Sequence, residues 1–127
     1  MLESAQSAIA VIGSINTDMV VKTQSLPSAG ETVMGGNFFM SAGGKGGNQA
    51  VAAARQGATV SMDANLGMDT LGDTAINKLQ AEGIDCKFVS RDEREASGVA
   101  LISVDAEGEN HIVVAPGANS TLSDKHI

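Results

Sequence analysis

A glycine-rich loop leads into an alanine-rich segment between residues 42 and 57. Residues 43–47 read Gly-Gly-Lys-Gly-Gly, a helix is predicted over residues 48–56, and Gly57 stands at its C-terminal end. Glycines let backbone N–H groups approach a ligand closely, and the first N–H groups of a helix have no intrahelical partners. The loop therefore predicts a binding site for an oxygen-rich ligand. The alternative is a purely structural turn, although a turn requires fewer glycines.

Two polar side chains follow the first apolar segment, which is predicted to be a buried strand over residues 9–12. Asn16 and Asp18 come after its carboxyl end, where ligands bind in open α/β sheets. Asn16 offers a donor and an acceptor, and Asp18 can accept from two hydroxyl groups. After a strand, Asn and Asp are also ordinary turn residues. Beside the glycine loop they supply the mixture of donors and acceptors that a neutral polyol requires.

The loop does not match two common phosphate-binding motifs. A P-loop requires Ser or Thr after its Gly-Lys pair, whereas Gly46 follows Lys45. A dinucleotide fingerprint requires a third glycine, and the sequence has Gln49 there. These differences disfavour a nucleotide-binding Rossmann domain.

Composition disfavours several other classes of protein. The 127 residues carry a net charge of −7, which argues against nucleic acid or an anionic membrane surface as the partner. No apolar stretch has transmembrane length, and residues 1–10 lack the features of a signal peptide. The single Cys86 excludes an internal disulfide and, with only two histidines, makes a zinc site improbable. We expect a cytoplasmic protein without a metal site in this chain.

The hydrophobic pattern predicts an α/β fold with a parallel sheet and a smaller antiparallel sheet. Besides the elements above, it predicts strands over residues 19–21, 31–40, 59–64 and 86–89, a hairpin of 98–104 with 109–114, a helix from Leu71 to Leu79 ended by Gly83, and a helix start at 121–124. The smaller sheet is expected from residues 17–22, 31–40 and 98–114. Asp69 and Asp73 are expected to cap the second helix, and the mixed charges of residues 91–95 indicate a solvated loop. Because the chain stops where a helix begins, we expect a truncated protein.

Four segments carry a resemblance to a known family. They are Gly-Ser-Ile-Asn-Thr-Asp at 13–18, Pro-Ser-Ala-Gly-Glu-Thr-Val at 27–33, Gly-Gly-Lys-Gly-Gly-Asn-Gln at 43–49 and Pro-Gly-Ala-Asn at 116–119. Together they resemble the N-terminal half of the ribokinase-like carbohydrate kinases, over about residues 9–124. The resemblance implies one three-layer α/β/α domain whose C-terminal half is missing. It also implies a β-sheet lid formed by about 17–40 and 98–114, through which a homodimer is expected.

The resemblance also implies a reaction. Family members transfer the γ-phosphate of ATP to a sugar's primary hydroxyl with Mg²⁺, and a monovalent cation such as K⁺ belongs to the family's sites. D-ribose, giving ribose 5-phosphate, is the expected substrate. Another pentose, a fructose-like sugar and a nucleoside remain alternatives, as does a non-catalytic sugar-binding or dimerising fragment. By similarity the sugar-binding residues are Asn16, Asp18, Gly43, Gly44, Lys45, Gly46 and Asn48, with Ala100 and Ile102 on a lid strand that lines the pocket.

The chain departs from the family in one respect. The Gly-Ala-Gly-Asp motif, which supplies the catalytic aspartate and the anion hole, does not occur. The catalytic aspartate and the nucleotide, magnesium and cation sites are therefore expected beyond residue 127. We expect the 127-residue chain alone to be inactive.

Overall fold

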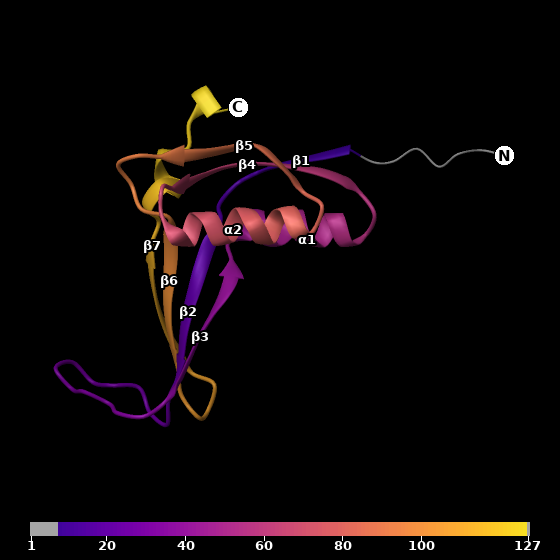
Figure 1. Ribbon diagram of the computed structural model, residues 1–127. Coiled ribbons are helices and arrows are strands. Elements are labelled where there is room, and N and C mark those ends of the chain that lie inside the picture. The colour runs from indigo at the N-terminus through magenta and orange to yellow at the C-terminus, as the bar shows by residue number, and fades with distance from the viewer. Residues whose placement is uncertain (1–7, 127) are drawn as a thin grey trace.

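The computed structural model describes residues 8–126, which form two β-sheets, two α-helices and two short 3₁₀ helices (Figure 1). In chain order the elements are β1 Ala8–Ile12, β2 Asn16–Lys22, β3 Asn37–Gly43, α1 Lys45–Arg55, β4 Thr59–Gly67, α2 Thr70–Ala81, β5 Asp85–Asp92, β6 Gly98–Val104, β7 Asn110–Ala115, and the 3₁₀ helices Gly117–Thr121 and Asp124–His126. No helix within the described range is long and apolar enough to cross a membrane.

Sheet A is parallel and has the strand order β1-β4-β5. Both helices lie on one of its faces, and among the described elements no α-helix covers the other face (Figure 1). Alternate residues of β4 face the helices, because side chains of a strand alternate between its two faces. The core consists of these β4 residues and their neighbours: Val11, Ile15, Ala50, Val60, Met62, Ala64, Leu66, Leu79 and Ile84. The expected α/β class is confirmed.

Sheet B projects from the carboxyl end of sheet A and has the order β3-β2-β6-β7 (Figure 1). The pairs β2–β3 and β6–β7 are antiparallel, but β2 and β6 are parallel. The prediction of an antiparallel sheet was therefore wrong for its central pair. Strands β1 and β5 run in the same direction in sheet A, and the chain continues from them into β2 and β6. Strands β2 and β6 therefore leave sheet A in the same direction.

Several predicted boundaries need correction. Helix α1 begins three residues early, at Lys45 rather than residue 48, and β2 begins at Asn16 rather than residue 19. Residues 31–36 are not in a strand, so the strand predicted over 31–40 was wrong in its first half. Strands β4 and β5 continue to Gly67 and Asp92, which places residues 91–92 in a strand and not in the expected loop. The helix expected from 121–124 is only the short 3₁₀ helix Asp124–His126.

Other local predictions are confirmed. The hairpin of β6 and β7 has nearly the expected ends. Helix α2 begins where the Asp69 carboxylate accepts from the Gly72 N–H at 2.8 Å, as expected for a cap. Gly57 and Gly83 follow the two helices with φ of +95° and +78°. Turn chemistry and helical spacing were therefore sufficient to place these element ends.

Candidate functional site

The predicted site residues converge where the two sheets join. Asn16 and Asp18 are residues of the first half of β2, which begins one residue before the segment 17–22 that was expected in the smaller sheet. Asn16 pairs with Gly43 of β3, and Asp18 pairs with Ser41 of β3 and Ala100 of β6. Because α1 starts just after β3, this pairing brings the glycine loop next to Asn16 and Asp18.

The glycine loop packs tightly against the segment that joins β1 to β2. A Cβ at Gly46 would lie 2.9 Å from the Gly13 Cα and the Ser14 N, and the Gly47 N–H donates to the Ser14 carbonyl at 3.0 Å. The N-cap residue Gly44 has φ of +89° and makes no side-chain cap. The prediction that the loop amides are open to a ligand was therefore wrong for Gly47, because that N–H is already bonded within the chain. The main effect of these glycines is that the loop can pack closely against the segment that joins β1 to β2.

The charged and polar side chains around this loop are available to a ligand. The ion pairs within residues 8–126 are Arg55–Glu82 and Arg91–Asp73, so neither Lys45 nor Asp18 has a charged partner in that range. Lys45 and Asn48 are exposed on the first turn of α1, and Asp18 is half-buried. The Asp18 carboxylate lies against Gly43, where a Cβ would be 2.6 Å from its Cγ. The arrangement offers acceptors from Asp18 and donors from Lys45 and Asn48 within one polar corner.

The two predicted lid residues lie on β6, on the same face of sheet B as Asp18. Ala100 is opposite Asp18 and is 5 % exposed, and Ile102 is opposite the buried Val20. They provide an apolar wall beside the polar corner. Such a wall can contact the C–H face of a sugar, and it also fits ordinary packing within the sheet.

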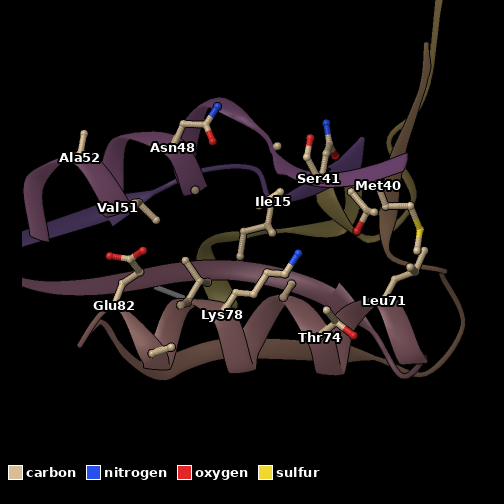
Figure 2. A pocket seen from close by; sticks show the side chains of 18 of the residues that line it. Ile15, Met40, Ser41, Asn48, Val51, Ala52, Leu71, Thr74, Lys78 and Glu82 are labelled. Atoms are coloured by element: carbon tan, nitrogen blue, oxygen red, sulfur yellow. The ribbon is translucent and has the colours of Figure 1, made fainter. Parts of the chain in front are cut away.

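A groove of about 690 Å³ runs between α1 and α2 (Figure 2). Asn16, Gly43 and Asn48 line it at one end, and Arg55 and Glu82, which form an ion pair, line it as well. Its remaining walls are mainly apolar, including Val51, Ala75 and Leu79. Since a sugar needs a partner for each buried hydroxyl, the end lined by Asn16, Gly43 and Asn48 suits one better than the apolar part of the groove.

Asn119, which was not predicted as a site residue, follows β7 and contacts the start of β2. Its Oδ1 accepts from the Ile15 N–H at 3.0 Å, and its Nδ2 donates to the Ile15 carbonyl at 3.0 Å and to Asn16 Oδ1 at 2.8 Å. The segment Pro-Gly-Ala-Asn at 116–119 was the only signal in the sequence. Its partners are more than 100 positions away, so spacing alone could not identify them.

The described residues do not assemble a metal site. Within residues 8–126 no group of three or more His, Cys, Asp or Glu side chains is placed to hold a metal ion. The acidic residues of this range therefore do not fit the Mg²⁺ that the resemblance implies. Burial, with a smaller contribution from Asp85, raises the pKa of the Cys86 thiol, which keeps it protonated and unreactive at neutral pH.

The chain is similar to known carbohydrate kinases. A family model described as pfkB family carbohydrate kinase matches residues 6–127. The chain is 44 % identical over 119 residues to a ribokinase of Haemophilus influenzae, covering 94 % of this chain and 39 % of the relative. It is 41 % identical over 119 residues to a deoxyribokinase of Salmonella typhi, with the same two coverages.

A solved structure shares the fold. The ribokinase of Arabidopsis thaliana complexed with ribose and ATP matches with a TM-score of 0.81 at 31 % identity, covering 91 % of this chain and 38 % of that one. The chain therefore spans about two-fifths of the length of the relatives it matches.

Proposed function

Because the chain belongs to the pfkB family of carbohydrate kinases, we propose that it supplies the sugar-binding half of an ATP-dependent sugar kinase. The enzyme transfers the γ-phosphate of ATP to a primary hydroxyl, and D-ribose, giving ribose 5-phosphate, is the proposed acceptor. Relatives named ribokinase and a related structure complexed with ribose and ATP support this choice. The observation that carries the proposal is the polar corner in which β2, the glycine loop and the first turn of α1 meet.

Each residue of the corner has a proposed role in binding the sugar. Asp18 accepts hydrogen bonds from two sugar hydroxyls, while Asn16, Lys45 and Asn48 contact others. Gly43, Gly44 and Gly46 let the loop lie close to the sugar. A Cβ at Gly43 would overlap the Asp18 carboxylate, and Cβ atoms at Gly44 and Gly46 would overlap the backbone of residues 13–16. Ala100 and Ile102 contact the apolar face of the ring from β6. This combination pairs the hydroxyls and also orients them.

Sheet B is the proposed lid over the sugar, formed by segments from about 17–40 and 98–114. A kinase must keep water away from the γ-phosphate, and closing a lid both excludes water and positions the acceptor hydroxyl. The projection of sheet B from the carboxyl end of sheet A supports this role, because the polar corner lies at that junction (Figure 1).

ATP, Mg²⁺ and a monovalent cation are proposed for the complete enzyme. When bound, Mg²⁺ would neutralise charge on the phosphates. Residues 8–126 do not fit a metal site, so we assign no step of phosphoryl transfer to them. We propose that the catalytic aspartate is also outside this chain and that the 127 residues alone bind sugar without phosphorylating it.

A homodimer through sheet B is also proposed. Large apolar side chains are exposed on that sheet, including Phe38, Leu101 and Val113. Exposed apolar surface of this kind is typical of protein–protein interfaces. Pairing two lids would cover it.

The test of the catalytic proposal is ATP-dependent phosphorylation by the purified native protein, with its intact mass measured in the same sample. Ribose, 2-deoxyribose, fructose and a nucleoside are compared by kcat/KM. We expect the highest value for ribose. Preference for deoxyribose would favour the second candidate, which the deoxyribokinase relative supports. A mass of 12.9 kDa with ribose binding and no transfer would favour a non-catalytic sugar-binding fragment.

A further inference from the structure

Asn119 holds the start of β2 in a fixed orientation. The backbone of Ile15 has one donor and one acceptor, and these cannot exchange places. The Asn119 amide pairs with both, since its Oδ1 faces the Ile15 N–H and its Nδ2 faces the Ile15 carbonyl, each at 3.0 Å. The orientation of the Asn119 amide is therefore determined by the main chain.

The orientation of the Asn119 amide determines the orientation of the Asn16 amide. The Asn119 Nδ2 also lies 2.8 Å from the Asn16 side chain and can only donate. Asn16 must present its oxygen to Asn119, so its Nδ2 group faces the other way. The Asn16 side chain is bonded to Asn119 through its Oδ1, and the residue is half-buried and lines the polar end of the groove. The Nδ2 group is therefore the donor that Asn16 offers on this side.

Gly98 provides the space for this contact. A Cβ at residue 98 would overlap Asn119 Nδ2 and would lie 2.5 Å from Asn16 Oδ1 and 2.8 Å from the Pro116 carbonyl. Gly98 pairs with Asn16 in the β2–β6 register. Gly98, at the start of β6, and Asn119, in the 3₁₀ helix Gly117–Thr121, thus act together on the Asn16 side chain.

We propose that Asn119 is a positioning residue that fixes the Asn16 amide with its Nδ2 toward the ligand, so that Asn16 binds the sugar as a donor only. The role toward sugar rests on the proposed function, whereas the orientation of the amide does not. Asn16 and Asp18 are on the same face of β2. Their polarities are complementary, because one hydroxyl can accept from Asn16 and donate to Asp18.

The first experiment measures the orientation without any ligand. Exchange of side-chain amide protons with water is followed by NMR in ¹⁵N-labelled protein, and the resonances are assigned by their loss in Asn16→Ala and Asn119→Ala. We expect the Asn119 protons to exchange at least about tenfold more slowly than those of exposed Asn48, because both are hydrogen-bonded. The Asn16 protons should exchange about as fast as those of Asn48. Protected Asn16 protons with unprotected Asn119 protons would overturn the proposal.

The second experiment is a double-mutant cycle on ribose affinity, measured by calorimetry. Asn119→Asp keeps the size of the side chain but replaces the donor by an acceptor, so the Asn16 amide must turn over. We expect the Kd for ribose to rise by about tenfold or more in the wild-type background and by less than about twofold in the Asn16→Ala background. An equal rise in both backgrounds would show a merely structural role and would overturn the proposal.

The control is Ser120→Ala in the same 3₁₀ helix. The exposed Ser120 hydroxyl donates to the Gly117 carbonyl at 2.8 Å, away from Asn16, so this variant should change neither the proton exchange nor the Kd. If the wild-type protein does not bind ribose, the proposed function fails, and the exchange measurement alone decides the orientation of Asn16.

Discussion

Asp69 and Ser97 are joined by two hydrogen bonds: the Ser97 N–H and hydroxyl donate to the Asp69 carboxylate at 2.8 and 2.6 Å. Asp69 is the N-cap of α2 and also accepts from the Gly72 N–H. Ser97 is buried, precedes β6 directly, and its Oγ accepts from the Gly67 N–H at 3.0 Å. The pair connects the end of β4 and the first turn of α2 to the start of sheet B.

Replacing Asp69 by Asn should destabilise the fold, because one amide oxygen cannot accept three hydrogen bonds as the carboxylate does. We expect a loss of about 1–2 kcal/mol in the free energy of unfolding at neutral pH, the usual range for a lost cap. Urea unfolding of the wild type and the variant measures it. Glu107→Gln, in the exposed β6–β7 turn, is the control and should leave the free energy unchanged.

The difference in unfolding free energy between wild type and Asp69→Asn should depend on pH. Burial tends to raise the pKa of Asp69. Hydrogen bonds from Ser97 and Gly72 and the charge of Arg91 together outweigh burial, so the pKa lies below its ordinary value. A lowered pKa in the folded state contributes stability above the unfolded value of about 3.9. That stability is lost as pH falls through the folded pKa. The difference between wild type and Asp69→Asn should therefore shrink below about pH 4, and a difference that stays constant would contradict this account.

Thr121→Val should raise the pKa of Asp92. The Thr121 hydroxyl, together with the N–H groups of Arg94 and Glu95, holds the pKa of Asp92 at about 2. Removing the hydroxyl removes the largest cause, so the pKa should move toward the ordinary value of about 3.9. Titration of the carboxyl carbon by NMR measures it, with Asp105 as an internal reference. An unchanged Asp92 pKa would show that the Thr121 hydroxyl does not bond this carboxylate in solution.

Two adjacent glycines of α1 should respond in opposite ways to alanine. Gly46→Ala places a Cβ 2.9 Å from the backbone of residues 13 and 14, whereas at Gly47 the nearest atom would be at 3.8 Å. We expect Gly46→Ala to cost about 1–3 kcal/mol of unfolding free energy by overpacking. Gly47→Ala should be neutral or stabilising by up to about 1 kcal/mol, since alanine favours helix. Equal effects at both positions would contradict the observed packing of the loop.

Leu101→Asp should abolish a dimer formed through sheet B. Leu101 is 49 % exposed and pairs with Val113, which is 65 % exposed, on the face of the sheet opposite Asp18. A buried unpaired charge in such an interface is strongly unfavourable. Sedimentation velocity measures the mass of the assembly, and Ile12→Asp in sheet A, at a residue of similar exposure, is the control. A monomeric wild type, or equal effects of the two variants, would contradict the proposed dimer.

Much of the fold could be predicted from local signals. Helical spacing from Leu71 to Leu79 predicted α2, and glycines with positive φ marked where both helices end. The start of α1 could not be predicted, because Gly46 and Gly47 have low helix propensity. They are helical because they pack on the backbone of the β1–β2 segment, which is a tertiary contact.

Part of the candidate site could also be predicted from local signals. The side chains of Asn16, Asp18, Lys45 and Asn48 could be chosen from their types and from the adjacent glycines. Two facts required the structure: that β2 pairs with β3 and β6 at Asn16 and Asp18, and that the Asn119 amide donates to Asn16 from 103 positions away. Contacts between residues so far apart leave no periodic pattern in a single sequence.

The central claim is that ribose binds in the corner formed by β2 and the glycine loop. The most direct test is a titration with D-ribose followed by the backbone amide resonances of the wild type and of Asp18→Ala. We predict saturable shifts at residues 16–18 and 43–48, and a Kd at least about tenfold weaker in Asp18→Ala, since a hydrogen bond to a charged group contributes about 1.5–3 kcal/mol. Absence of shifts, or shifts confined to the apolar part of the α1–α2 groove around Val51 and Leu79, would contradict the claim.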